Sequence, residues 1–250
     1  MIELKTAGEL EHMRRAGRVV AGLLEHLEPL VQPGVPTKAL DREAMAYLRR
    51  QRAQPAFLGY RGFPACICVS INEEVVHGIP GDRTIQAGDV VSLDVGAVVK
   101  GFYGDAATTV IVGHATERVR RMVDVTAQAL REGIQQVAAG HRLSDISHAV
   151  QRCVEEHGFG IVREFVGHGI GRALHEDPPI PNFGPPHVGP RLAVGMVLAI
   201  EPMVTLGHHD VEVLADGWTA VTKDRQPAAH FEHTVALTDH GPEIFTARSS

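Results

Sequence analysis

The sequence is poor in cysteine and contains no long apolar run. Among 250 residues it has three cysteines, Cys66, Cys68 and Cys153, which are too few for a disulfide framework. The spacing of Cys66 and Cys68 does not suit a zinc knuckle. No apolar stretch reaches membrane-spanning length, and the polar N-terminus does not read as a signal peptide. These absences argue against a secreted or membrane protein and favour a reduced, cytoplasmic setting.

The composition is that of an ordinary globular protein with a slight excess of acid. Hydrophobic residues make up 44% of the chain and charged residues 22%, which provides enough apolar material for a large core. The net charge of −6 gives no general attraction for nucleic acid or for a membrane surface. No linker or low-complexity segment divides the chain. We therefore expect a single domain over residues 1–250, with halves of about 1–112 and 113–250.

Residues 90–112 carry the most informative pattern in the sequence. The stretch VVSLDVGAVVKGFYGDAATTVIV is rich in valine, alternates, and is broken by Lys100-Gly101, which predicts a β-hairpin. Each strand carries an aspartate, Asp94 and Asp105, and these would lie directly or diagonally across the ladder, roughly 5–8 Å apart. Two carboxylates at that distance repel each other, so a shared proton, a basic partner or a metal cation must offset the repulsion.

The rest of the chain predicts helices and strands in a repeated order. Two helices precede the first group of strands and two more precede the second, which suggests an internal duplication. We therefore expect an α+β fold in which helices cover one face of a mainly antiparallel sheet. The predicted helices are 7–31 with a Thr6–Glu9 capping box, 37–52 capped by Thr37, 116–139, and 144–157 capped by Ser144; the predicted strands include 66–71, 195–204 interrupted by Glu201, a hairpin over 211–222, and 230–238 as the last.

Several carboxylates and imidazoles interrupt the strands or follow them in glycine-rich loops. No lysine or arginine is planted in the same strands, so two divalent cations would be the natural counterions. Oxygen-rich ligation with one imidazole suits Mn(II), Fe(II) or Co(II) better than a structural zinc site. A water that bridges two such ions loses a proton near neutral pH, which implies hydrolysis of an amide or ester. The set is Asp94, Asp105, His168, Glu201 and Glu232, with His77 and His175 nearby.

These residues fall in motifs that resemble those of the short bacterial methionine aminopeptidases, within the wider pita-bread metallohydrolases. The motifs are VVHGIP, LDVGAVVKGFYGD, VGHGIGRALHEDP, AIEPM, DGWT and FEHT, in the family's order and over nearly the whole chain. The resemblance implies a pita-bread fold with a pseudo-twofold axis. It also implies metal-dependent removal of the N-terminal methionine from nascent proteins with a small second residue, by a metal-bridging hydroxide.

The resemblance gives each acid and one histidine a metal-binding role. Asp94 would chelate one ion, and Asp105 and Glu232 would bridge both. His168 and Glu201 would complete the other site. One ion would also take the free amine of the substrate, which restricts cleavage to the first residue. Glu201 or Glu232 would pass a proton to the leaving amine.

The resemblance also assigns the substrate contacts. His77 would lie beside the first peptide unit of the substrate. His175 would donate a hydrogen bond to the scissile carbonyl or the developing oxyanion. An unbranched thioether favours a deep pocket with polarizable and aromatic walls. The methionine side chain would be received by Tyr60, Phe63, Cys68, His77 and Trp218, with Phe57 and Leu174 nearby.

Three positions depart from the family's pattern. Gly96 stands where Ser or Thr is usual, His230 where Gln is usual, and Leu174 where an aromatic residue is usual. A glycine at position 96 is more typical of the proline dipeptidases, so an Xaa-Pro aminopeptidase or proline dipeptidase of the same fold is one alternative. Those enzymes generally carry an extra N-terminal domain and an acidic pair where this chain has FEHT, which favours the methionine enzyme. A metal-free binding module is the alternative of another class, and the five retained ligands argue against it.

The sequence leaves several properties open. Co, Mn, Fe and Zn all fit such ligands, so the identity and occupancy of the metals stay undetermined. Docking at the ribosome is open as well. No long exposed apolar stripe is evident, which favours a monomer. His208-His209-Asp210 reads as a polar loop, because nothing nearby in the sequence completes a coordination shell.

Overall fold

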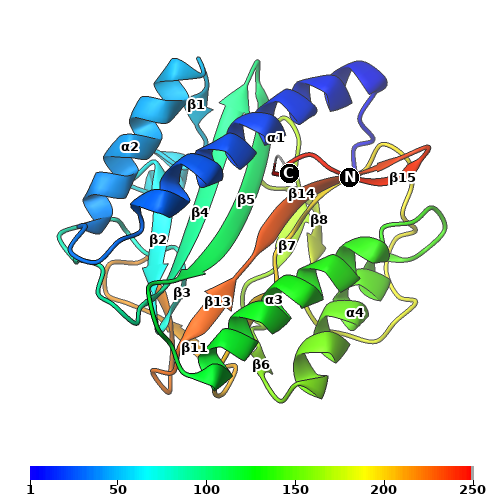
Figure 1. Cartoon of the computed structure of the whole chain (residues 1–250). Coiled ribbons are helices and arrows are strands. Elements are labelled where there is room, and N and C mark those ends of the chain that lie inside the picture. Colours follow the sequence, from blue (N-terminus) through cyan, green and yellow to red (C-terminus); the bar gives the residue numbers. More distant parts are fainter. Residues whose placement is uncertain (249–250) are drawn as a thin grey trace.

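The computed structural model describes residues 1–248 and shows a sheet covered by helices (Figure 1). Both predicted pairs of helices are present. The helices are α1 Ala7–Leu27, η1 Glu28–Leu30, α2 Thr37–Arg50, η2 Tyr60–Gly62, α3 Glu117–Gln135 and α4 Leu143–Glu156. The strands are β1 Gln54–Pro55, β2 Ile67–Ile71, β3 Glu74–Val76, β4 Val90–Val99, β5 Phe102–Ile111, β6 Gly160–Ile161, β7 Gly167–Gly169, β8 Glu176–Ile180, β9 Val197–Ile200, β10 Met203–Thr205, β11 Val211–Val213, β12 Ala220–Thr222, β13 Ala228–His230, β14 Glu232–Thr238 and β15 Gly241–Ile244.

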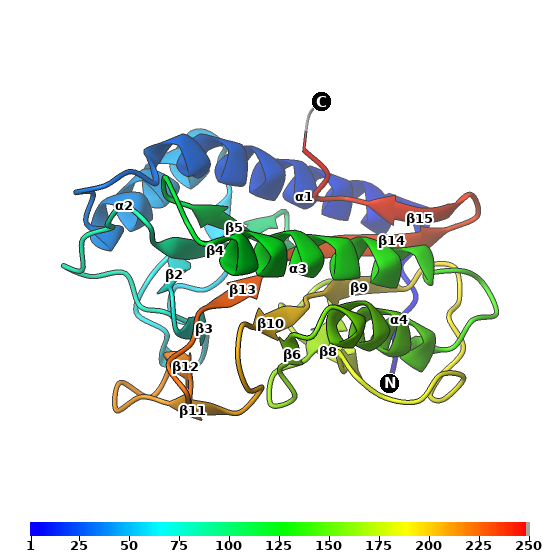
Figure 2. The same cartoon turned by 60° about the horizontal axis from the view of Figure 1, so that its bottom comes forward.

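One large sheet runs through both halves of the chain. Its strand order is β1-β4-β5-β14-β9-β7-β8, with β2 beside β4 and β15 beside β14. Every pairing between the described strands is antiparallel. Helices α1 and α2 lie over the half that holds β4 and β5, and α3 and α4 lie over the other half (Figures 1 and 2). The predicted α+β fold, with helices on one face of an antiparallel sheet, is confirmed.

Helix α1 begins where its sequence satisfies its first N–H groups. Thr6 N–H donates to Glu9 Oε2 at 2.8 Å, and Glu9 N–H donates to Thr6 Oγ1 at 3.4 Å, so the predicted capping box is confirmed. The helix packs an apolar stripe that includes Met13 against β4 and β5. It lies so close to β5 that a Cβ on Gly104 would be 3.0 Å from the backbone of Ala16. This face of the hairpin is therefore sealed by the helix.

Two of the predicted helix caps are wrong. Thr37 is the first residue of α2, and its hydroxyl exchanges hydrogen bonds with the backbone of Gly81. Ser144 lies inside α4, where its hydroxyl accepts a hydrogen bond from Val188 N–H, and Arg142 occupies the cap position. Each hydroxyl has a tertiary partner that competes with the local capping bond. The helices also end up to four residues earlier than predicted, at positions 27, 50, 135 and 156.

The central hairpin has the predicted turn. Lys100 and Gly101 form the two-residue connection between β4 and β5. Their φ values are 51° and 80°, which is the backbone of a type I′ turn. Asp94 stands opposite Ala107, two positions along β5 from Asp105. The two aspartates therefore lie on a diagonal of the ladder and not directly opposite each other.

The strands after residue 195 differ in part from the prediction. Residues 195–204 form two strands, β9 and β10, which belong to different sheets, and Glu201 lies at their junction. The 211–222 hairpin is confirmed as β11 and β12, which pair on either side of Asp216-Gly217. The predicted last strand is divided at Phe231 into β13 and β14. It is also not the last, because a turn at Asp239-His240 returns the chain along β14 as β15, which begins at Gly241 with a φ of 100°.

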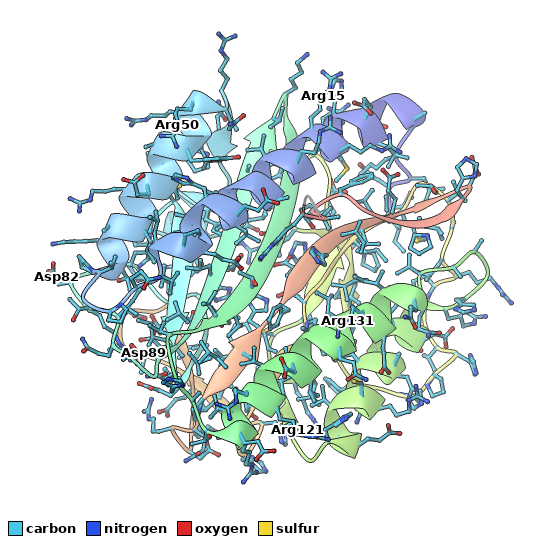
Figure 3. All side chains as sticks on the ribbon, in the orientation of Figure 1. Arg15, Arg50, Asp82, Asp89, Arg121 and Arg131 are labelled. Atoms are coloured by element: carbon cyan, nitrogen blue, oxygen red, sulfur yellow. The ribbon has the colours of Figure 1, made fainter. Side chains whose placement is uncertain are left out.

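Most charged side chains lie on the outside of the molecule. Figure 3 shows Arg15 on α1 and Arg50 on α2 at its rim. Arg14 and Arg15 pair with Glu11 at 3.5 and 3.4 Å, and exposed pairs of this kind contribute less than about 1 kcal/mol each. The fold is held instead by apolar clusters between the sheet and its helices. Across residues 1–248, no helix has the length and apolar character needed to span a membrane.

Candidate metal centre

Strand register brings three of the predicted ligands onto one face of the large sheet. Asp94 on β4 and Glu232 on β14 both stand opposite Ala107 of β5. Asp105 lies two residues from Ala107 on the same strand. Residues directly opposite in a ladder share a face, as do residues two apart along one strand. Gly104, the neighbour of Asp105, faces α1, so the three carboxylates point to the side of the sheet away from that helix.

The same register brings the other two ligands to this face. Thr234 of β14, two residues after Glu232, stands opposite Ala199 of β9. His168 of β7 also stands opposite Ala199. Glu201 follows Ala199 by two residues, just beyond the end of β9. Strands β4, β5, β14 and β7, together with the position just after β9, thus each supply one predicted ligand.

The ligand atoms lie close enough to share metal ions. Those of Asp105, His168 and Glu232 are all within 4.8 Å of one another, and the three residues are buried. His168 Nε2 lies 3.5 Å from Glu201 Oε1. One oxygen each of Asp94, Asp105 and Glu232 is buried without a hydrogen-bond partner among the described residues. Within residues 1–248, no lysine or arginine forms an ion pair with the four carboxylates, whose only ionic contacts are with histidine.

Burial and mutual repulsion both oppose ionisation of these acids. Burial raises the pKa of Asp94 to about 7. Burial, and then the charges of neighbouring carboxylates, raise the pKa values of Asp105, Glu201 and Glu232 well above the usual range. Bound cations reverse this balance, because they are larger local charges than any side chain. The cluster is therefore poised to exchange protons for metal ions.

His168 is oriented as a metal ligand. Its Nδ1 lies 2.9 Å from the carbonyl oxygen of Gly169, and a carbonyl only accepts, so Nδ1 carries the proton. Nε2 then presents a lone pair to Glu201 Oε1, so this contact is favourable with a proton on Glu201 or with a cation between the two atoms. Burial lowers the pKa of His168 to about 3, which keeps the ring in its neutral, ligating form. Four carboxylates and one neutral imidazole form a donor set that fits divalent ions.

The acidic cluster borders a cavity of about 140 Å³. A cavity of this size suits one side chain and not a long peptide. All of the predicted site residues line it. They are Phe57, Tyr60, Phe63, Cys68, His77, Asp94, Asp105, His168, Leu174, His175, Glu201, Trp218 and Glu232.

One further residue, Arg61, lines the cavity and was missed from the sequence. It has a φ of 48°, the left-handed region, which aims its side chain over the Tyr60 ring at 5.4 Å. The flanking Gly59 and Gly62 also have positive φ. That clustering of glycines was visible in the sequence as a tight bend, but it did not indicate where the arginine would point.

Aromatic rings form the cavity wall away from the acids. Tyr60 stacks on His175 with ring centroids 5.2 Å apart. Phe63 meets Trp218 edge to face at 5.1 Å. Such pairs hold their rings in fixed orientations and leave an apolar, polarizable surface. The wall is therefore suited to an unbranched apolar side chain.

Two histidines connect this wall to the acids. The His175 ring lies 4.1 Å from the His168 ring, and burial, then the charge of Arg61, lowers the pKa of His175. His77 has a φ of 61°, uncommon outside glycine, and burial lowers its pKa to about 4. Strained backbone and shifted pKa values together are typical of functional positions. Both rings are neutral near pH 7, so each has one N–H to donate and one nitrogen to accept.

Two other features of the described residues do not belong to this site. A larger hollow of about 590 Å³ lies between α4 and the 186–191 segment and contains none of the predicted site residues. His208, His209 and Asp210 also bring ligand atoms within 4.8 Å of one another, but the His208 side chain is 66% exposed. Within residues 1–248, the cluster around Asp105 is the buried group with metal-ligand spacing.

The three departures from the family's pattern lie at or beside the cavity. A Cβ on Gly96 would be 2.7 Å from both Ala56 Cβ and Phe57 Cε1, so serine or threonine does not fit here without a shift. Leu174 is buried in the cavity wall. His230 does not line the cavity but lies behind it, with Nε2 3.7 Å from Glu201 Oε2.

The antiparallel sheet, its single helical face and the acidic cluster define a metallohydrolase with the pita-bread fold. Comparison with known proteins agrees with this class. Metallopeptidase family M24 matches residues 11–239. Methionine aminopeptidase 1 of Bacillus subtilis is 52% identical over 246 residues, covering 98% of this chain and 99% of that protein. The methionine aminopeptidase of Escherichia coli is 43% identical, and the match covers 99% of this chain and 94% of that protein.

Solved structures show the same relationship. The methionine aminopeptidase of Thermotoga maritima has a TM-score of 0.98 and 48% identity, covering 99% of this chain and all of its own. The prolidase of Pyrococcus furiosus has a TM-score of 0.81 at 21% identity, and the match covers 99% of this chain and 66% of the prolidase chain. At this identity the match shows the shared fold alone.

The chain belongs to metallopeptidase family M24. The resemblance to methionine aminopeptidases and the pita-bread fold inferred from the motifs are both confirmed. Membership of this family implies divalent metal ions, and the buried acids provide the ligand atoms for them.

Proposed function

We propose that this protein removes the N-terminal methionine from nascent proteins whose second residue is small, and that it uses two divalent metal ions. The observation that carries the proposal is the juxtaposition of unpaired buried carboxylates with a ring-lined cavity of side-chain size. Relatives named methionine aminopeptidase match over the full chain, which supports the same reaction here. The continuous sheet across both halves supports a single catalytic domain over residues 1–250.

The five ligands divide between two ion positions. Asp94 would chelate one ion, Asp105 and Glu232 would bridge both, and His168 and Glu201 would hold the other. Bound divalent ions would supply Lewis acidity for the scissile amide and lower the pKa of water to near neutrality. Mn, Fe and Co are the ions that this donor set favours, and zinc also fits it.

The cavity walls determine which peptide is accepted. The rings of Tyr60, Phe63 and Trp218, with Cys68 beside Asp94, receive the methionine side chain. Phe57 and Leu174 border the same space. A thioether gains S···aromatic contacts on such walls that a shorter side chain does not reach. The free amine of the substrate points towards the carboxylates, so a chain that continues before the methionine is excluded.

Three polar residues assist the reaction. His175, held by its stack on Tyr60, donates a hydrogen bond to the carbonyl oxygen as negative charge develops there. His77 binds the first peptide unit. Glu201 carries a proton to the leaving amine, since it is partly exposed whereas Glu232 is buried.

The proposed substrates are the N-terminal peptides of nascent proteins. We propose that the protein acts on them as a monomer in the cytoplasm. The three free cysteines are all buried, in keeping with a reducing compartment. Ribosome docking would bring the enzyme to its substrates but is not needed for the chemistry.

A cleavage assay with three peptides tests the proposal. Purified protein is supplied with Mn²⁺, and Met-Ala-Ser is compared with an Xaa-Pro tripeptide and an Xaa-Pro dipeptide. We expect release of methionine from the first peptide, and its loss on chelation. Preferred cleavage of an Xaa-Pro bond would instead identify a proline-specific enzyme. A protein that binds no metal and cleaves none of the three would be a binding module.

A further inference from the structure

His230 is buried with both of its ring nitrogens unsatisfied. The residue is 2% exposed, at the end of β13 (Figure 1), and neither Nδ1 nor Nε2 has a hydrogen-bond partner among residues 1–248. Its backbone is fixed, because its N–H donates to Thr109 Oγ1 at 2.9 Å and the Thr109 hydroxyl donates to its carbonyl at 2.8 Å. Buried polar side chains nearly always have partners, so this ring calls for a specific explanation.

The ring points at one carboxylate of the metal cluster. His230 Nε2 lies 3.7 Å from Glu201 Oε2, while the other oxygen, Oε1, lies 3.5 Å from His168 Nε2. Glu201 is therefore placed between two imidazoles from different strands. A hydrogen bond to a carboxylate has a length of about 2.7–2.9 Å, so a movement of about 0.8–1 Å brings His230 and Glu201 into contact.

We infer that His230 is a positioning residue that donates a hydrogen bond from Nε2–H to Glu201 Oε2 and so keeps Oε1 directed at His168. The inference rests on the proposed function, in which Glu201 and His168 hold one ion together. Carboxylates that bind metals are generally hydrogen-bonded by a further side chain, and that partner fixes their orientation. A neutral imidazole has one N–H, so His230 selects one of the two Glu201 oxygens.

The position of His230 argues against a role as a sixth ligand. It does not line the cavity, and it lies outside the group formed by Asp105, His168 and Glu232. It acts on the metal through Glu201 and not directly. A glutamine at this position would also offer N–H donors, so the property that matters for the proposed role is the donated hydrogen bond and not the imidazole ring itself.

The test compares a variant that keeps the donor with one that removes it. H230Q retains an N–H at a similar distance, and H230L fills the site without one. Each is stripped with chelator and titrated with Mn²⁺ by calorimetry. We expect H230L to bind one of the two ions about 10–100-fold more weakly and H230Q to stay within about threefold of wild type. Turnover of Met-Ala-Ser should show a lower kcat for H230L with little change in KM.

Stability of the metal-free proteins separates positioning from packing. H230L removes two unsatisfied buried atoms, so its urea midpoint without metal should be equal to or above that of wild type. A purely structural role for His230 predicts a lower midpoint instead. H12L is the matched control, because His12 Nδ1 is also buried without a partner but stacks on Phe102. It should leave Mn²⁺ affinity unchanged.

The outcomes are distinct. Equal Mn²⁺ affinity for H230L and wild type would overturn the inference, and so would equal losses in H230L and H230Q. If H230L fails to fold, His230 is a packing residue and the inference is overturned. If wild type binds no metal, the proposed function falls and takes the inference with it. If wild type binds two ions and only the His230 comparison fails, the proposed function stands.

Discussion

The acidic cluster should destabilise the protein when the metal is absent, and one substitution can show this. Asparagine at position 94 keeps the shape of Asp94 but cannot ionise. Asp94→Asn should therefore make the metal-free protein more stable at neutral and alkaline pH, while it weakens metal binding. A gain in stability from removing a metal ligand is the result that a merely structural aspartate would not give.

The size and sign of the effect follow from the pKa of Asp94. Burial raises this pKa from 3.8 to about 7 in the folded protein. Because the folded value exceeds the unfolded one, the associated stability is fully present below about pH 4 and is lost as the pH rises through about 7. A pKa difference of one corresponds to about 1.4 kcal/mol, so the loss from Asp94 amounts to about 4 kcal/mol. Asp94 also raises the pKa values of Asp105, Glu201 and Glu232, so its removal eases their ionisation as well.

Urea unfolding of chelator-treated protein at about pH 5 and about pH 8 measures the difference. Between these pH values, wild type should lose about 3 kcal/mol more unfolding free energy than Asp94→Asn. Added Mn²⁺ should reverse the order at the higher pH, because it stabilises wild type more strongly. Asp239→Asn, in the exposed turn between β14 and β15, is the control and should follow wild type. Equal pH dependence of Asp94→Asn and wild type would refute the reasoning.

Four other changes have definite expected results. Glu232→Ala should abolish turnover and the pairing of ions, since Glu232 would bridge both; an active variant that holds two metals on elemental analysis would contradict this. His175→Ala should lower kcat by about 10²–10³-fold with metal content intact, and an unchanged kcat would exclude its role at the carbonyl. Gly96→Ala should lower the unfolding free energy by about 1–3 kcal/mol in urea, because its Cβ meets a phenylalanine ring at 2.7 Å; no loss would mean that the ring moves aside. The protein should retain its own Met1, because Ile2 is β-branched and too large for the proposed specificity, and an intact mass without methionine would argue against that specificity.

The four acids of the candidate metal centre were predictable because each of them breaks a local rule. Asp94 and Asp105 interrupt alternating apolar strands on either side of one recognisable turn. Glu201 and Glu232 do the same in two later strands. A buried carboxylate is conspicuous in such a pattern, and four of them without a basic partner limit the physical solutions to protons or metal ions. The sequence could not show that β14 lies between β5 and β9, because register between distant strands is set by tertiary packing.

The two wrong helix caps have a common physical origin in partners that are distant along the chain. The Thr37 hydroxyl bonds to Gly81, 44 residues away, and so does not cap its own helix. The miss of Arg61 has a local cause: a left-handed backbone, which no side-chain pattern indicates, places its guanidinium over the Tyr60 ring at the cavity. The periodicity of the sequence predicts on which face of a helix or strand a side chain lies. Which residue it then contacts depends on how the helices and strands pack against one another.

Gly96 shows why one departure from a motif is weak evidence for a different specificity. In the sequence it leaned towards the proline enzymes, whose motif shares this glycine. In the structure, the space that a serine or threonine would need is filled by Ala56 and by Phe57, a residue of the cavity wall. The glycine is therefore explained by packing with a segment 39 residues earlier, and it carries no separate information about the substrate. Under the proposed function, specificity for the first residue depends on the cavity wall, where the rings of Tyr60 and Trp218 would contact the thioether of methionine.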